Sequence, residues 1–491
     1  MQQINLGEQK LLKLCGHFSL ALILSASSLT AESFADFKKT QQASFSKHKD
    51  EKDNEFNKYL AQQWKEYNAY KGTPLFEEPK PKQITPAKKE KLVVVGPPVY
   101  IKVQEPKVEP KPKPIAPPPE EIVKPKIMEK EITFDFFGTK LGFSKPSKTE
   151  KARFAPQNKE GITNFFNAMA SSDTKTLLGE ISDVKQKLNL NDWGLYLLVQ
   201  KISENIYPSQ DEARLMHWFL FNKLGYAVRV GLTGKNIALL HHSKKTIYST
   251  PNYKIENQKF YVLSHYNKGS VGKLYTYEQN YPGATRALDL KLATLPTFEA
   301  DMKNKTLEFK NYAQTHTIAY EYNKNLIDFM STYPQADYET FFNAPMDEQS
   351  YQAIAKELKK IVDGKKASEA MNIVLRFVQN AFEYQRDDEQ FGREKVMFAQ
   401  ETLYYDKSDC EDRSTLFASL IKELFGVGVV GIKYKDHIAT ALQIPLEGDK
   451  VTINQKEFVI ADPTYINANI GQSMPQYKSI RPESFVVVVG R

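Results

Sequence analysis

The sequence predicts an α+β fold in which helices pack on antiparallel sheets. Three observations support this. Apolar residues recur at helical spacing over 161–224 and 347–384, short strand-like runs separated by turn residues follow these helices, and two distant segments can be aligned with each other. With 491 residues, 41% of them apolar and 12% aromatic, the chain is long enough for roughly two to four domains with hydrophobic cores.

The charge balance argues against a nucleic-acid partner. The chain carries 67 basic and 59 acidic residues, a net charge of +8, and no basic stripe. It has neither a phosphate-binding glycine loop nor a dinucleotide fingerprint. We therefore expect no nucleic acid and no cofactor, although a mildly basic exterior is compatible with an anionic cell envelope.

Residues 1–35 have the pattern of a signal peptide. Lys10 and Lys13 precede an apolar run over 14–29, and the small residues Ser33 and Ala35 stand where a signal peptidase reads the chain. We expect cleavage after Ala35 and a periplasmic or secreted protein. An uncleaved N-terminal membrane anchor is the alternative, but the run is short and rich in serine for a full span.

Only two cysteines are present, Cys15 and Cys410. Removal of the signal peptide would leave Cys410 as the sole thiol, so that no intrachain disulfide could form. A lone thiol in an oxidising compartment is a liability unless it is buried or chemically used. Catalysis is one of the few positive reasons to keep it.

Two segments separate the signal from the folded body. Residues 36–72 are predicted to be a polar helical segment, and we favour a solvated helix over a partner-binding coil because its apolar residues are sparse. Residues 73–130 form a linker rich in Pro, Lys and Glu, with 14 of the 26 prolines of the chain. Proline fixes φ and removes amide donors, which predicts an extended spacer. A docking peptide for a proline-recognising partner is the alternative reading, and the helical segment and the linker together could also meet a cell-envelope partner.

The folded body divides into three predicted parts. The first, 131–280, opens with a strand and turn at 134–139 and continues with helices that break near 171–173 and 207–209. The second, 281–346, carries strand-like alternation that includes 288–292, which predicts a β-rich connecting domain, either a small β-sandwich or a sheet insert. The third, 347–491, starts with helices over 347–362 and 368–384.

The first and third parts contain similar segments. Residues 208–225 and 237–240 can be laid over 408–426 and 438–441 with one single-residue gap, and both copies read as acidic cap, apolar helix, glycine and two strands. This alignment pairs three polar residues of each copy, namely Gln210 with Cys410, Asn236 with His437, and roughly Ser264 with Asp462. The first copy is therefore predicted to be a degenerate duplicate that serves as scaffold or binding domain. Chance similarity between two helix-then-hairpin units is the alternative.

The predicted nucleophile is Cys410, at the start of an apolar-faced helix that ends at Gly426. Free backbone amides and the helix dipole favour a thiolate there, whereas Glu411 and its acidic neighbours oppose it. A histidine acting as ion-pair partner would resolve this conflict. For Cys410 alone, a buried structural thiol is the competing reading.

Two further residues complete a candidate triad. His437 opens the predicted strand 438–444, and Asp462 ends the predicted strand 458–461 before Pro463. Adjacent antiparallel strands would place His437 beside Asp462, which would then fix the imidazole tautomer and stabilise its charged form.

Cys410 at a helix start, His437 at the start of one strand and Asp462 before Pro463-Thr464 on the next resemble the transglutaminase-like core, a branch of the papain-like cysteine enzymes. The resemblance covers roughly 368–465. It implies a Cys-His-Asp triad that acts through a thioester acyl-enzyme, as in crosslinking transferases, proteases, amidases and enzymes that cleave peptidoglycan peptides. Many members carry an aromatic residue and an alanine shortly after the cysteine, where this chain has 411–414 with the sequence Glu-Asp-Arg-Ser.

We therefore expect an exported cysteine hydrolase or acyltransferase that acts on a peptide, protein or peptidoglycan-like substrate. The rival expectation is a non-enzymatic, envelope-tethered binding protein in which both copies are scaffolds. A metal site at His241-His242 lacks acidic or thiol partners at ligand spacing, so we expect no metal and read the two histidines as a solvated pair.

Overall fold

The computed structural model describes residues 50–77, 80–104 and 130–488. The predicted signal peptide lies outside these residues, and so does the second half of the predicted linker. The described residues from Asp53 onwards belong to one compact unit. Within the described ranges no helix is both long and apolar enough to span a bilayer.

The segment that precedes the linker packs into the core. Helical residues 53–62 bury Phe56 and Leu60, which are 1% and 0% exposed. The Phe56 ring lies 5.3 Å from the Phe166 ring and 5.2 Å from the Tyr281 ring. The prediction of a solvated helix is therefore wrong for these residues. The apolar residues of this segment are few, but they pack against aromatic side chains that include Phe166 and Tyr281.

The first module, 131–280, begins with a hairpin and four helices. The hairpin consists of β2 (Ile132–Phe136) and β3 (Thr139–Phe143), as the sequence predicts. The helices are α2 (Lys159–Ala170), α3 (Lys175–Lys187), α4 (Asp192–Ile206) and α5 (Gln210–Lys223). They break where Ser, Asp and Pro interrupt the apolar pattern, and once more near residue 190.

A six-stranded sheet completes this module. Its strands are β1 (Lys65–Asn68), β4 (Val228–Thr233), β5 (Asn236–His242), β6 (Asn252–Ile255), β7 (Gln258–Tyr261) and β8 (Lys273–Thr276). They lie in the order β1-β8-β4-β5-β7-β6, and every pairing is antiparallel. The 3-10 turn η1 (Leu263–His265) follows β7.

The connecting region contains one hairpin and two helices. The hairpin is β9 (Met302–Asn311) with β10 (Gln314–Asn323), and α6 (Lys324–Ser331) and α7 (Tyr338–Phe342) follow. This hairpin is a two-stranded sheet, so of the two predicted forms the sheet insert fits and the small sandwich is wrong. Residues 288–292 form no strand although Leu288, Leu290 and Leu292 are buried, because alternating burial also occurs in an extended segment that covers a core without a pairing partner.

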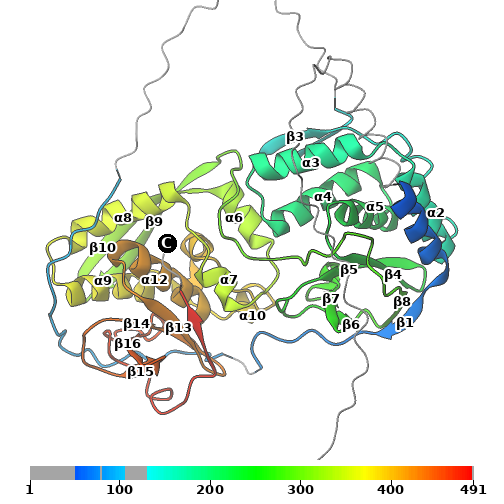
Figure 1. The fold of residues 1–491 in the computed structure, drawn as a ribbon. Helices are drawn as coiled ribbons and strands as arrows, with labels where there is room; N and C mark the ends of the chain where they lie inside the picture. The colour runs from blue at the N-terminus through cyan, green and yellow to red at the C-terminus, as the bar shows by residue number, and fades with distance from the viewer. Residues whose placement is uncertain (1–49, 78–79, 105–129, 489–491) are drawn as a thin grey trace, which may run out of the picture. The chain divides into compact units, whose positions relative to one another are not determined.

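The second module, 347–488, supplies helices on one side of a sheet (Figure 1). Its helices are α8 (Glu348–Val362), α9 (Ala367–Asn380), α10 (Asp387–Gln390), α11 (Ala399–Tyr404) and α12 (Cys410–Phe425). Two short strands, β11 (Glu383–Tyr384) and β12 (Lys407–Ser408), pair in parallel just before α12. Helix α12 ends at Gly426, whose φ of +63° is the left-handed conformation that glycine adopts most easily.

The five-stranded sheet of this module is also antiparallel. Its strands are β13 (Val429–Lys433), β14 (Ile438–Leu442), β15 (Lys450–Ile453), β16 (Lys456–Ala461) and β17 (Ser484–Val487), in the order β15-β16-β14-β13-β17. Strand β14 lies between β13 and β16. The strands predicted over 438–444 and 458–461 are present with bounds shifted by a few residues.

The two sheets have the same strand order. Read from one edge, β6-β7-β5-β4-β8 corresponds to β15-β16-β14-β13-β17, and β1 is an additional edge strand of the first sheet. The registers also agree. The last pair of the central hairpin joins Thr233 to Asn236 in the first sheet, and the Tyr434 amide bonds the His437 carbonyl in the second.

The helix that precedes each sheet is set in the same register. Arg214 Nη1, on α5, donates to the Ile237 carbonyl at 3.1 Å, and Ser414 Oγ, on α12, donates to the Ile438 carbonyl at 3.1 Å. Residue 214 of the first module therefore occupies the place of residue 414 in the second. Mixed α+β architecture is thus established, and the two modules share a helix-plus-sheet topology.

The first half of the predicted linker lies along the second module. Residues 80–104 are extended and contain no helix or strand. Their backbone bonds to this module at several points, including Ala87 to Ile466, Ala367 to Pro97 and Gly364 to Val99. These pairings need backbone donors and acceptors on the second module rather than a side-chain pattern in the linker, so no pattern in the sequence indicates them.

Candidate active site

The three predicted triad residues come from α12, the start of β14 and the end of β16. Cys410 is the first residue of α12 and is fully buried. The Asp409 amide, just before it, donates to Asp412 Oδ2 at 3.3 Å, which closes the first turn. The bond from Ser414 to the Ile438 carbonyl then ties this turn to the strand that His437 opens.

His437 and Asp462 are brought together. His437 Nε2 lies 2.9 Å from Asp462 Oδ2, and both side chains are buried. Asp462 Oδ1 accepts from the backbone amides of Thr464 at 2.9 Å and Tyr465 at 3.2 Å. The carboxylate is thus held from the far side, so that it can orient the imidazole.

The other imidazole nitrogen has no partner. His437 Nδ1 is buried and makes no hydrogen bond with any described residue. The Tyr477 ring stacks on the imidazole with centroids 4.8 Å apart, and its hydroxyl donates to Asp436 Oδ1 at 3.0 Å. The ring plane is therefore fixed by Tyr477 and Asp462 while Nδ1 is left available. The sequence did not point to Tyr477, which follows an irregular segment.

Cys410 makes its hydrogen bond to an acid and not to the histidine. Its Sγ donates to Glu411 Oε2 at 3.1 Å. Burial, together with the charges of Glu411 and Asp409, raises the pKa of the Cys410 thiol well above its usual range, against an opposing effect of Lys80. The helix N-terminus favours a thiolate, but burial and the acids outweigh it, and the thiol is neutral in this state.

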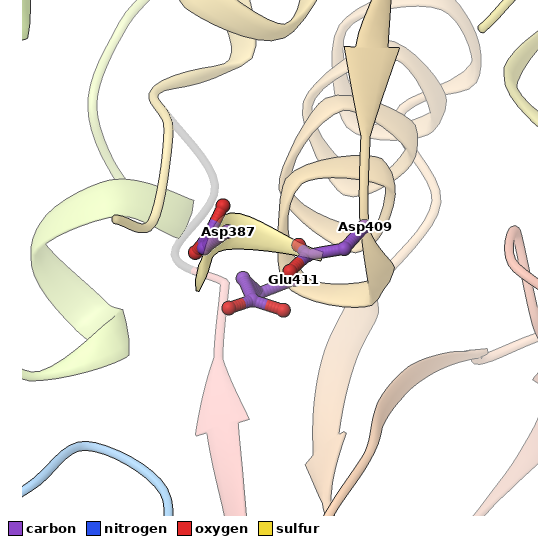
Figure 2. A group of neighbouring side chains, drawn as sticks. All are labelled: Asp387, Asp409 and Glu411. Atoms are coloured by element: carbon purple, nitrogen blue, oxygen red, sulfur yellow. The ribbon is translucent and has the colours of Figure 1, made fainter. Parts of the chain in front are cut away.

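The acids belong to a buried cluster. Figure 2 shows the carboxylates of Asp387, Asp409 and Glu411 converging from α10 and from the start of α12. Ligand oxygens of these three residues lie within 4.8 Å of one another, close enough to hold a cation. Burial and the neighbouring Asp409 charge raise the pKa of Asp387 to about 8, and the same two causes raise the pKa of Glu411 well above its usual range.

A lysine from the linker lies within this cluster. Lys80 Nζ is 2.7 Å from Asp409 Oδ2 and 3.4 Å from Asp387 Oδ2, and it also bonds Glu411. Glu394 Oε2 lies 2.8 Å away. Burial alone would lower the pKa of Lys80, but the carboxylates raise it well above its usual range. The lysine ammonium is thus the cation that the carboxylates hold.

The first module carries the three residues that correspond to the triad on the equivalent helix, strand and turn. Gln210 begins α5, Asn236 begins β5 and Ser264 lies in η1.

His241 and His242, predicted to be a solvated pair, are only 1% and 8% exposed, so this prediction is wrong. Strand β5 lies inside its sheet, which buries side chains on both faces.

The chain matches no family model, and neither a curated protein nor a solved structure matches it.

Proposed function

We propose that the chain is an exported cysteine-dependent amide or acyl hydrolase or transferase of the transglutaminase-like type. Cys410 is the nucleophile, His437 the base and Asp462 the residue that orients the base. The substrate is a peptide, protein or peptidoglycan-like chain of the cell envelope. The observation that carries the proposal is the buried His437–Asp462 pair at 2.9 Å, whose Nδ1 has no partner among the described residues. The strand that follows His437 is bonded by Ser414 of the helix that begins with Cys410.

The reaction follows from these positions. Cys410 Sγ attacks the carbonyl carbon while its proton passes to His437 Nδ1, and the C–S bond forms. His437 then protonates the leaving amine as the C–N bond breaks, which leaves a thioester. Water or an incoming amine, deprotonated by His437, attacks the thioester and releases the thiol. The backbone N–H of Cys410 stabilises the oxyanion, and Asp462 stabilises the imidazolium.

The acid cluster defines the resting state of this site. A neutral thiol bonded to Glu411 is less readily oxidised than a thiolate, which suits a lone thiol in an oxidising compartment. Proton transfer must then accompany attack, because no preformed thiolate–imidazolium pair exists. Lys80 keeps the surrounding carboxylates neutralised while this happens.

One observation favours the rival function. A buried, protonated thiol that bonds an acid is also what a structural cysteine would show, and in that case both modules are binding or scaffold domains of an envelope-tethered protein. The linker and the N-terminal segment would then serve an envelope partner. The two functions differ in whether Cys410 reacts.

Alkylation separates the two functions. We expect iodoacetamide near pH 7.5 to label Cys410 in the folded wild type, with the site mapped by peptide mass so that Cys15 does not interfere. Labelling should slow at least tenfold in His437→Ala, because the base is lost, and remain unchanged in His242→Ala, which alters a histidine outside the site. Cys410 that resists labelling in the folded wild type, or that is labelled equally fast in His437→Ala, overturns the proposal.

A further inference from the structure

The first module contains a cavity of about 410 Å³. Helices α4 and α5, strand β5 and the turn after β7 line it, together with Thr332 and Pro334, which follow α6 in the connecting region. Gln210 and Ser264, which correspond to Cys410 and Asp462, lie on its wall. The cavity therefore occupies the place that the candidate active site has in the second module, but its wall offers neither thiol nor aspartate at those positions. The volume is in the range of small-molecule and side-chain pockets.

Two buried histidines in this wall have ring nitrogens without a hydrogen-bond partner among the described residues. His217 and His241 are 3% and 1% exposed, and their rings are 5.4 Å apart. His217 Nε2 and both nitrogens of His241 make no hydrogen bond with described residues. Burial lowers the pKa of His241 to about 3 and that of His217 well below its usual range, so both imidazoles are neutral.

The fold does not require these histidines. By the shared register of helix and strand, His217 corresponds to Phe417 and His241 to Leu442, and both of these are fully buried apolar residues of the second module. Replacing such a pair by unsatisfied imidazoles destabilises a core, because each buried polar atom without a partner loses its hydrogen bond to water. The histidines therefore need a partner that the chain itself does not supply.

The rest of the wall indicates the chemistry of that partner. Trp193 and Tyr196 stack on each other 4.9 Å apart and form an aromatic side of the cavity. Arg214 is already bonded to Asp211 and to the Ile237 carbonyl, so its charge is compensated. Glu204 and Lys268 also line the cavity, so its wall carries charges of both signs, whereas the buried imidazoles offer partners to an uncharged group.

We propose that this cavity binds an uncharged carboxamide attached to an apolar or aromatic body, as in a peptide amide. A neutral imidazole has one N–H donor and one acceptor nitrogen, and a carboxamide presents an acceptor oxygen and N–H donors side by side. A carboxylate has acceptors only and leaves the acceptor nitrogens unpaired. Binding without turnover follows from the residues at the Cys410 and Asp462 positions, and it is independent of the proposed reaction.

The first experiment compares the binding of two ligands that differ in charge. N-acetyl-L-phenylalaninamide and N-acetyl-L-phenylalanine differ only in the amide and the carboxylate. Isothermal titration of the full chain at pH 7.5 should give saturable binding of the amide and at least tenfold weaker binding of the acid. Cys410→Ala should bind the amide with unchanged affinity, which separates this site from the candidate active site.

The second experiment replaces the two histidines by the residues at the corresponding positions of the second module. His217→Phe combined with His241→Leu introduces the residues that the same fold carries there, and it should weaken amide binding at least tenfold. His242→Phe is the matched control, because His242 is the next residue of β5 and its Nδ1 is already bonded to the Lys259 carbonyl. Equal or tighter binding of the acid, no saturable binding of the amide to the wild type, or unchanged binding in the double variant overturns the proposal.

Discussion

Lys80 offers the sharpest test of how the candidate site is held together. Its ammonium is buried and contacts Asp387, Asp409, Glu411 and Glu394. At the 2.7 Å separation from Asp409, and with an effective dielectric constant of about 20, a pair of unit charges attracts by about 6 kcal/mol. Desolvation of both groups offsets part of this. Removing one partner of a buried pair costs about 3–5 kcal/mol, because it leaves the other charge uncompensated.

The perturbation is Lys80→Met, which keeps the length of the side chain and removes the charge. We expect the free energy of unfolding, from urea titration at pH 7, to fall by about 3–5 kcal/mol. Lys82→Met is the matched control. Lys82 lies two residues away in the same segment and is exposed, so its removal should change the free energy by less than about 0.5 kcal/mol.

The pH dependence provides a second criterion. The pKa of Asp387 rises from its ordinary 3.8 to about 8 in the folded state, so that the folded chain binds this proton more tightly than the unfolded chain. The stability from this proton is present below about pH 4 and is lost as the pH rises to about 8. Asp387 is largely protonated at pH 7 and becomes charged above about pH 8, where it needs the Lys80 ammonium more. Lys80→Met should therefore cost more at pH 9 than at pH 7. A loss below about 1 kcal/mol at pH 7, or an equal loss at pH 7 and pH 9, would contradict this account of the cluster.

Three further outcomes follow from single contacts. Glu411→Gln removes the carboxylate that lies nearest to the Cys410 thiol, so the pH midpoint for alkylation of Cys410 by iodoacetamide should fall by about one unit. An unchanged midpoint would show that the charge of Glu411 does not raise the pKa of this thiol. Gly426→Ala should lower the free energy of unfolding by about 1–2 kcal/mol, because its φ of +63° is unfavourable for alanine. Gly179→Ala is the control: this residue lies inside α3 with open space around the added Cβ, so the substitution should raise the free energy of unfolding by about 0.5–1 kcal/mol. If both variants changed the free energy of unfolding in the same direction, backbone conformation would not explain the effects. Phe56→Ala should cost about 3–5 kcal/mol if the N-terminal segment is part of the core, and a cost under about 1 kcal/mol would place it outside.

Local pattern was enough to find the elements of the candidate site. The apolar face that ends at Gly426 predicted α12, and Pro463 marked the end of β16. Because adjacent antiparallel strands bring such ends together, the proximity of His437 and Asp462 could be predicted from strand order alone. The correspondence of Gln210 with Cys410 was likewise visible as aligned residues.

Contacts between distant segments decided the rest. Nothing near Lys80 indicates that it reaches carboxylates more than 300 residues away, because an ion pair across the fold leaves no periodic trace in either segment. The segment around Phe56 and Leu60 has too few apolar residues to predict a core. These residues are buried because aromatic side chains from later in the chain pack against them.

The buried histidine His241 shows the same limit. Sequence patterns were sufficient for the helix and strands around the candidate site and for naming its three candidate residues. The protonation of Cys410, the cation that balances its acids, and the burial of His241 depend on tertiary contacts. These properties depend on desolvation and on charge at short range, and both are set by which distant segments enclose a group.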